Sequence, residues 1–317
     1  MRIKTIKLEN GFNYKRRVTM KFSVVTDMLG KESFEEAVQH AKQLNFDYVD
    51  LRAMLDGDTI DTISIDKAKK LHQLIRKYDL KVSTLSSWAV NPCTFSGEPK
   101  YNNKDENHHQ KMRQVLDRLL DLADAFDATY IRIYPLHRNE GFDQLSENEK
   151  ELEYKYNAQI LKGHAEHAQK RGKVLLVENE PPTLANTVGE LAKIMEYADH
   201  PNLKVNWDIV NGWRAGEYPT LQQYEKIKGN VHQVHIKGAS RVINSSTNDN
   251  PHGLFNNFTI AGQDDFDHEE IMKALLAGDP HVILTIDTHY PSFYQQDKIG
   301  EVEVIERTKE FFEKTLA

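Results

Sequence analysis

Eight short apolar runs alternate with amphipathic segments along this chain, and this alternation restricts the fold more than any other feature. The clearest run, residues 174–177, reads Val-Leu-Leu-Val and has no polar alternation. Such a run is typical of a strand buried on both faces, as in a parallel sheet covered by helices. The intervening segments repeat apolar residues at helical intervals. Strands that alternate with helices in this way indicate an α/β fold.

The number of strand–helix pairs points to one architecture. The expected strands cover residues 21–27, 48–51, 80–85, 129–134, 174–180, 203–207, 231–236 and 281–286. The expected helices cover residues 33–44, 64–78, 104–126, 149–171, 187–198, 221–227, 266–276 and 298–315. Eight such pairs predict a single (β/α)₈ TIM barrel. An open doubly wound sheet would need a glycine-rich phosphate loop after its first strand, and residues 26–30 do not form one.

Length and composition limit the domain organisation and the class of partner. No proline- or glycine-rich linker divides the 317 residues, so we expect one barrel domain over residues 20–317 after an N-terminal extension over residues 1–19. That extension lacks the apolar core of a signal peptide, and no apolar run approaches the roughly 20 residues of a membrane span. The single cysteine, Cys93, excludes an internal disulfide and favours the cytoplasm. The net charge of −7 argues against a nucleic-acid groove.

Four consecutive strands end on a residue that can bind a metal ion. These residues are Glu178, Asp208, His235 and Asp287. In a barrel, the carboxyl ends of the strands meet at one mouth, where active sites lie. Three carboxylates and one imidazole suit Mn²⁺ first, and Mg²⁺, Co²⁺ and Zn²⁺ also fit this donor set. Each residue alone could instead cap a helix or make an ordinary hydrogen bond, but four in register favour a metal site.

Five further residues lie where the mouth of such a barrel is expected. Lys237 would hold a substrate oxygen or phosphate, or be a solvated loop lysine. Asn211 would bind a substrate hydroxyl or serve as a turn residue, and Trp88 would stack on the apolar face of a substrate or pack in the core. Arg132 lies inside a strand, where an unpaired charge is costly, so we expect it to meet a carboxylate or the substrate. His137 is a substrate-binding candidate or a plain loop residue.

The order of these motifs resembles the xylose isomerase-like barrels, and within them the sugar phosphate isomerase/epimerase group that includes ketose 3-epimerases. The resemblance covers most of the chain from about Lys21. It rests on Val-Glu-Asn-Glu at 177–180, Leu-Ala-Asn-Thr-Val-Gly-Glu-Leu at 184–191, Asn-Trp-Asp at 206–208, Val-His-Ile-Lys-Gly at 234–238 and Ile-Leu-Thr-Ile-Asp at 283–287. The resemblance implies that the four strand-end residues named above are the family's metal ligands.

The resemblance also implies a reaction: a metal-dependent isomerase or epimerase that acts on a small sugar or sugar phosphate through an enediolate. Glu178 would remove a proton from one face of the substrate, and Asp287 would return it from the other. Two positions depart from the family pattern, because Asn211 stands where a histidine is common and Asp287 where glutamate is usual. The shorter Asp287 side chain reaches the substrate less well, which leaves the two-base scheme open.

Three other functions fit parts of the sequence. A phosphodiesterase like the apurinic endonucleases would need further histidines, which the strand ends at residues 50–52 and 86–88 lack. A dehydratase or lyase of a cyclitol or sugar acid would share the metal site and the proton abstraction, whereas a non-catalytic ligand-binding barrel would bind no divalent ion. The long polar insertion at residues 239–263 would act as a lid or be a flexible loop. The sequence is compatible with a homo-oligomer and identifies no interface.

Overall fold

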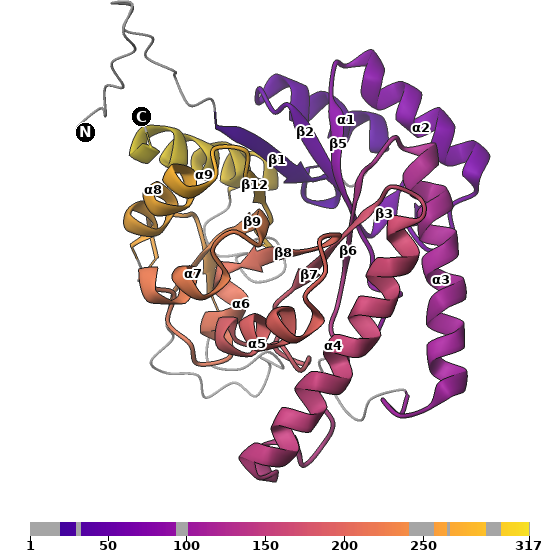
Figure 1. Ribbon diagram of the computed structural model, residues 1–317. Coiled ribbons are helices and arrows are strands. Elements are labelled where there is room, and N and C mark those ends of the chain that lie inside the picture. The colour runs from indigo at the N-terminus through magenta and orange to yellow at the C-terminus, as the bar shows by residue number, and fades with distance from the viewer. Residues whose placement is uncertain are drawn as a thin grey trace, which may run out of the picture.

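Eight parallel strands close into a barrel that helices surround, as Figure 1 shows. Around the barrel the strands follow the order β1–β12–β9–β8–β7–β6–β5–β2. The predicted (β/α)₈ TIM barrel is therefore confirmed. This computed structural model describes residues 20–29, 33–92, 101–240, 257–264, 267–289 and 299–316. The predicted N-terminal extension and residues 241–256 of the predicted insertion lie outside these ranges.

The predicted barrel strands and surrounding helices are all present, and their ends differ from the predictions by a few residues at most. The barrel strands are β1 (Lys21–Val25), β2 (Tyr48–Leu51), β5 (Lys81–Ser86), β6 (Tyr130–Ile133), β7 (Val174–Glu178), β8 (Leu203–Asp208), β9 (Val231–Ile236) and β12 (Ile283–Ile286). The predicted helices are α1 (Phe34–Gln43), α2 (Ile65–Lys77), α3 (Glu106–Ala125), α4 (Glu147–Gln169), α5 (Val188–Ala198), α7 (Leu221–Ile227), α8 (His268–Gly278) and α9 (Glu301–Leu316).

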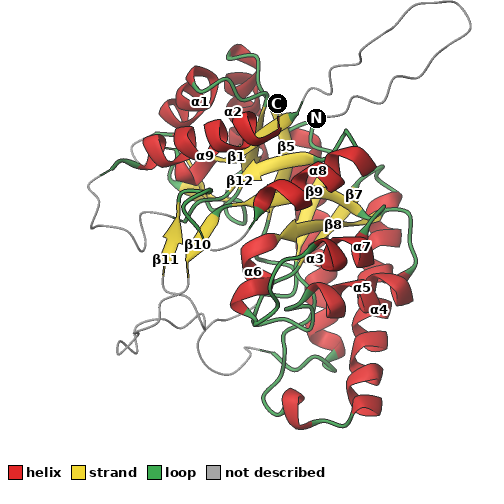
Figure 2. Cartoon of the chain, turned by 90° about the vertical axis from the view of Figure 1, so that its left-hand side faces the viewer, coloured by secondary structure: helices red, strands yellow, loops and turns green. Residues whose placement is uncertain are grey.

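Several short elements were not predicted. They are the helix α6 (Ile209–Arg214), the 3₁₀ turns η1 (Thr26–Met28) and η2 (Phe142–Gln144), and two antiparallel hairpins, β3 (Met54–Leu55) with β4 (Asp58–Thr59) and β10 (Gly238–Ser240) with β11 (Asn257–Thr259). The second hairpin joins the two ends of the predicted insertion, and Figure 2 shows it beside the barrel strands. It begins one residue after Lys237, so it fixes the backbone next to the mouth.

The starts of several helices carry hydrogen-bonded N-caps. Thr187 Oγ1 accepts the backbone N–H of Glu190 at 3.2 Å, and the Glu190 carboxylate accepts the backbone N–H of Thr187 at 3.2 Å, which completes a capping box at the start of α5. Ser33 likewise accepts the N–H of Glu36 at the start of α1. An N-cap of this kind stabilises a helix by about 1 kcal/mol.

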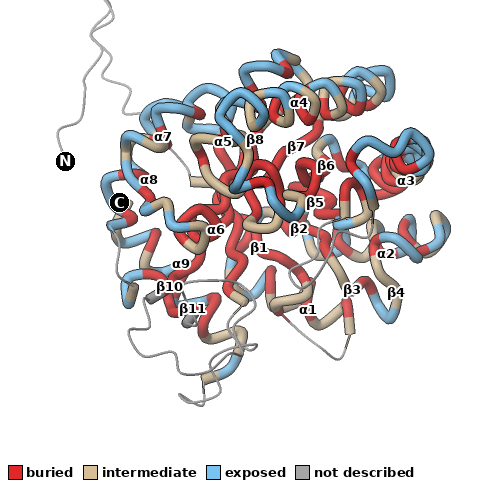
Figure 3. The backbone as a smooth tube through the Cα atoms, turned by 90° about the horizontal axis from the view of Figure 1, so that it is seen from below, coloured by how far each residue is buried: buried red, intermediate tan, exposed pale blue. Residues whose placement is uncertain are grey.

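Burial separates the molecule into a strand cylinder and an outer helical layer. Figure 3 shows buried backbone along the strands and exposed backbone on the outer faces of the helices. Apolar side chains of both layers pack into one continuous core. Among the described residues, no helix is long and apolar enough to cross a membrane.

The inside of the barrel contains polar side chains that bond to one another. Ser23 and Ser83 share a hydrogen bond of 2.8 Å, and the Thr84 hydroxyl donates to the side-chain carbonyl oxygen of Gln233. A bulge places one extra residue, His232, in β9. Its neighbours Val231 and Gln233 pair with the consecutive residues Val205 and Asn206 of β8. Bulges re-aim side chains and are common next to active sites. Beyond this bulge, Gln233 and His235 both face the barrel interior.

Candidate metal centre

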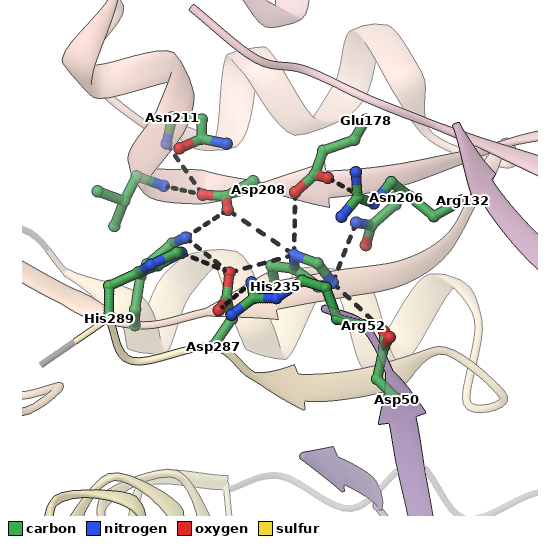
Figure 4. A network of polar contacts seen from close by, with 12 residues as sticks. Asp50, Arg52, Arg132, Glu178, Asn206, Asp208, Asn211, His235, Asp287 and His289 are labelled. Carbon is green, nitrogen blue, oxygen red and sulfur yellow. Dashed lines mark hydrogen bonds and ion pairs between the residues drawn. The ribbon is translucent and has the colours of Figure 1, made fainter. Parts of the chain in front are cut away.

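Three of the predicted metal ligands meet at the carboxyl end of the barrel. Glu178 ends β7, Asp208 ends β8 and His235 lies near the end of β9. One ligand atom of each lies within 4.8 Å of the other two, and the residues are only 2%, 0% and 1% exposed. The Nδ1 atom of His235 is 2.9 Å from Glu178 Oε1 and 3.8 Å from Asp208 Oδ2, as Figure 4 shows. This group has the donor types of a divalent metal site.

The two carboxylate oxygens of Asp208 contact different partners. Its Oδ1 accepts the backbone N–H groups of Val210 at 3.0 Å and Asn211 at 2.9 Å, and so caps helix α6. Its Oδ2 faces the ligand group and lies 2.6 Å from the Lys237 ammonium. Helix capping and metal ligation are therefore compatible, because the two oxygens point to different partners.

The fourth predicted ligand, Asp287, lies beside this group but contacts several nitrogen donors. Its Oδ1 accepts from Arg52 Nη1 at 2.7 Å, and its Oδ2 lies 3.0 Å from both Lys237 Nζ and His289 Nε2. Burial alone would raise the pKa of Asp287, but Arg52, His289 and Lys237 hold it well below its ordinary value. Asp287 Oδ2 is 3.6 Å from His235 Nδ1. Its part in metal binding and catalysis stays a prediction.

The buried ion-pair network around the ligands contains more carboxylates than arginine and lysine side chains. Six carboxylates face four such cations, while His235 and His289 add positive charge only when they are protonated, and burial raises the pKa of Glu180 to about 8. A divalent cation bound at the ligand group would offset carboxylate charge, and buried charges without balance are costly. The carboxylates are Asp27, Asp50, Glu178, Glu180, Asp208 and Asp287, and the cations are Arg52, Arg132, Arg214 and Lys237.

Arg132 holds the carboxylate of Glu178. Arg132 Nε lies 3.0 Å from Glu178 Oε2, and both side chains are almost fully buried. Burial alone would raise the pKa of Glu178, but Arg132 and His235 outweigh it and lower the pKa. Arg132 also donates to the Ser87 carbonyl at 3.2 Å. The prediction that Arg132 meets a carboxylate is consistent with this contact, and its contact with a substrate stays a prediction.

Lys237 and Asn211 are buried and engaged. Lys237 is 1% exposed and bridges Asp208 and Asp287, so it is not a solvated loop lysine. The Asn211 amide nitrogen donates to Glu180 Oε2 at 2.9 Å. Asn211 lies inside α6 and not in a turn. Substrate binding by either residue stays a prediction.

Trp88 and His137 occupy different environments. Trp88 is 49% exposed, so its ring is not core packing, and the Arg52 guanidinium lies 6.0 Å from the ring centroid. His137 is buried, its backbone N–H donates to the Tyr101 hydroxyl at 3.0 Å, and its backbone carbonyl accepts from the Asn103 side chain at 2.9 Å. Trp88 is therefore open to a ligand, and substrate binding by either residue stays a prediction.

Sequence reasoning gave no role to three polar residues beneath the ligands. The Asn206 and Gln233 amide nitrogens lie 3.1 and 3.2 Å from His235 Nε2, and Asp50 Oδ2 lies 3.6 Å from the same atom. All three are fully buried in barrel strands. A polar residue inside an apolar strand was the available signal, because such residues are rarely buried without a partner.

Comparisons with known proteins agree with this architecture. A family model described as xylose isomerase-like TIM barrel matches residues 38–315. A 3-dehydroshikimate dehydratase of Bacillus anthracis is 25% identical over 131 residues, which is 41% of this chain and 44% of that protein. The match thus spans less than half of the relative's length.

Solved structures share the fold over nearly the whole chain. The IOLI protein, whose structure has a bound zinc atom, matches with a TM-score of 0.70 at 17% identity. The matched region covers 94% of this chain and 98% of the IOLI chain. A D-allulose 3-epimerase from Methylomonas sp. has a TM-score of 0.69 at 14% identity, covering 93% of this chain and 98% of its own. At these identities the similarity shows the fold alone.

Proposed function

The chain belongs to the xylose isomerase-like TIM barrel family, and from this membership and the geometry of the mouth we propose that it is a divalent-metal-dependent isomerase or epimerase of a small sugar or sugar phosphate. The observation that carries most weight is the buried group of Glu178, Asp208 and His235. Mn²⁺ is the proposed ion, since oxygen donors predominate. One cysteine and a net charge of −7 support a cytoplasmic enzyme of small molecules.

The proposed roles follow from the contacts of each side chain. A bound divalent cation would polarise the substrate carbonyl and stabilise negative charge on its oxygen. Glu178 removes the proton next to that carbonyl, and Arg132 at 3.0 Å keeps this carboxylate ionised and oriented. Asp287 would have to carry a proton at the start of the cycle and give it to the opposite face, while Glu178 keeps the abstracted proton, and Lys237 beside Asp287 holds a substrate oxygen. The half-exposed ring of Trp88 receives the apolar face of the sugar.

A dehydratase is the second candidate, and the surroundings of Asp287 favour it. Because Arg52, Lys237 and His289 all contact this carboxylate, it is less free to exchange a proton with a substrate. An elimination needs one base, and Lys237 would supply the proton to the departing hydroxyl. The dehydratase relative from Bacillus anthracis supports this candidate.

A substrate panel in D₂O separates the two reactions. The Mn²⁺-loaded protein is incubated with ketoses, ketose phosphates and 3-dehydroshikimate, and proton NMR follows the products. Isomerisation or epimerisation predicts deuterium next to the carbonyl together with a new sugar isomer, whereas dehydration predicts an unsaturated product. Glu178→Gln should abolish either activity, and the exposed Glu196→Gln is the matched control. Metal binding without any reaction would contradict both candidates.

A further inference from the structure

Asp50 is a buried carboxylate whose position needs a reason. It lies in β2, inside the barrel, with 0% exposure. Among the described residues, the only side chain in ion-pair contact with it is His235, whose Nε2 is 3.6 Å from Asp50 Oδ2. Its other oxygen, Oδ1, has no hydrogen-bond partner within the described part of the chain. The buried Arg132 guanidinium attracts this carboxylate without a direct ion pair. A buried carboxylate that lacks a direct arginine or lysine contact is costly, so it is expected to serve a specific partner.

A hydrogen-bonded chain across the barrel fixes this carboxylate. The side-chain amide of Gln233 on β9 makes both contacts. Its nitrogen donates to Asp50 Oδ2 at 2.8 Å, and its carbonyl oxygen accepts from the Thr84 hydroxyl on β5. Three strands therefore hold Asp50 in place below His235, and Figure 4 shows Asp50 on the opposite side of the imidazole from Glu178.

The two nitrogens of His235 face different surroundings. Nδ1 points to the ligand group, 2.9 Å from Glu178 Oε1, and Nε2 points to Asp50. An imidazole that binds a metal through one nitrogen donates the N–H of the other nitrogen, usually to a carboxylate or carbonyl. The Asn206 and Gln233 amide nitrogens lie 3.1 and 3.2 Å from Nε2 and cannot accept its proton, and the Gln233 side-chain carbonyl oxygen already accepts from Thr84. Asp50 Oδ2 lies slightly beyond hydrogen-bond distance, at 3.6 Å, and within the described part of the chain it is the only carboxylate oxygen in ion-pair contact with Nε2.

We propose that Asp50 is a positioning residue of the metal centre, which accepts the Nε2–H of His235 and so keeps Nδ1 free to bind the ion. Gln233 and Thr84 act through Asp50 by fixing its carboxylate. This inference rests on the metal site of the proposed function and not on the identity of the reaction or the substrate.

Metal affinity of the full-length protein tests this role. Mn²⁺ or Zn²⁺ is titrated into chelator-stripped protein against a chromophoric competitor. Asp50→Asn should weaken the affinity 10- to 100-fold, as loss of such an outer partner does. The melting temperature of the stripped protein should not fall, because asparagine has nearly the same shape as aspartate and the substitution removes a buried charge. A purely structural residue would give the opposite pattern: a lower melting temperature and unchanged affinity.

Two further variants make the result specific. Asp264→Asn removes a buried carboxylate that pairs with His268 outside the ligand network, and it should change the affinity less than about threefold. Asp50→Glu should recover part of the affinity that Asp50→Asn loses. In the Zn²⁺-loaded protein, nitrogen-15 NMR should show the Nε2–H tautomer of His235, with a proton shift that moves in Asp50→Asn.

The possible outcomes separate this inference from the proposed function. If Asp50→Asn binds the metal ion with wild-type affinity, the inference is overturned. If Asn206→Ala weakens metal binding instead, the side-chain amide of Asn206 is the partner of Nε2. A wild-type protein that binds no divalent ion overturns both this inference and the proposed function. A large loss in Asp50→Asn together with no reaction on any substrate supports the inference while the proposed function fails.

Discussion

At the scale of single residues, the two oxygens of Asp208 allow its two roles to be separated. Asp208→Asn keeps an oxygen for the N–H groups of Val210 and Asn211 but removes the charge from the ligand group. We expect at least tenfold weaker Mn²⁺ binding with little loss of stability, by analogy with other changes around metal sites. Asp208→Ala should also lower the free energy of unfolding by about 1 kcal/mol, the usual value of a cap. Chelator competition and urea denaturation measure the two effects, and wild-type affinity in Asp208→Asn would contradict its role as a ligand.

The pair of Arg132 and Glu178 gives a second prediction at this scale. Arg132→Met leaves a buried carboxylate without its arginine, and we expect the free energy of unfolding to fall by about 3–5 kcal/mol. The double variant with Glu178→Gln should recover much of that loss, because the unpaired charge is gone. Urea denaturation measures all three proteins. Arg113→Met, which breaks an exposed pair with Glu106, is the control and should cost less than about 1 kcal/mol.

At the scale of elements, the packing of α3 against α4 predicts that the stability of the folded protein depends on pH. His164 on α4 is buried, and burial lowers its pKa to about 4, with the nearby side chains of His109 and Arg113 adding to the effect. The unfolded chain binds this proton near its ordinary pKa of 6.5, so the folded state loses stability as the pH falls from 6.5 toward 4. The loss between pH 7.5 and 4.5 should be about 2–3 kcal/mol.

A comparison of His164→Gln with wild type isolates the contribution of His164 to the pH dependence of the free energy of unfolding. Urea denaturation at the two pH values should show a smaller stability loss in the variant, since glutamine does not titrate. His232, whose pKa burial also lowers to about 4, contributes equally to both proteins and cancels. Parallel stability curves for the variant and wild type would refute the prediction.

The hairpin of β10 and β11 predicts a steric effect next to Lys237. A Cβ atom on Gly238 would lie 2.5 Å from Thr259 Oγ1 and 2.7 Å from the Ile260 carbonyl oxygen, so the strands would have to move apart. We expect Gly238→Ala to lower the free energy of unfolding by about 1–3 kcal/mol, the usual cost of overpacking. Denaturation measures it. Gly163→Ala is the control, because it adds a methyl group in open space on a helix and should stabilise by up to about 1 kcal/mol.

Elements of the strand–helix alternation were predictable from the sequence, and the short elements between them were not. The strand at 48–51 and the helix at 221–227 have the predicted bounds, because their apolar pattern is local information. Helix α6 was missed because it follows β8 directly and contains Asn211 and Gly212, which favour other conformations. Its stability comes from the local cap of Asp208 and from the burial of the Trp213 ring, and only the second of these is a tertiary contact.

At the scale of the whole molecule, barrel topology explains which site residues could be predicted. Glu178, Asp208 and His235 end three successive strands that pair side by side, so strand order alone brings them together. The partners of Asp287 were not predictable in this way, because Arg52 reaches it only after β1 pairs with β12 and closes the barrel. The single domain over residues 20–317 stays a prediction.

The most direct test of the central claim is the anomalous difference map of a crystal of the full chain grown with Mn²⁺. We predict one strong peak per chain, bonded to the carboxylates of Glu178 and Asp208 and to Nδ1 of His235. A map with no peak between these three side chains, or with a cluster of several metal ions there, would contradict the proposed single-ion centre.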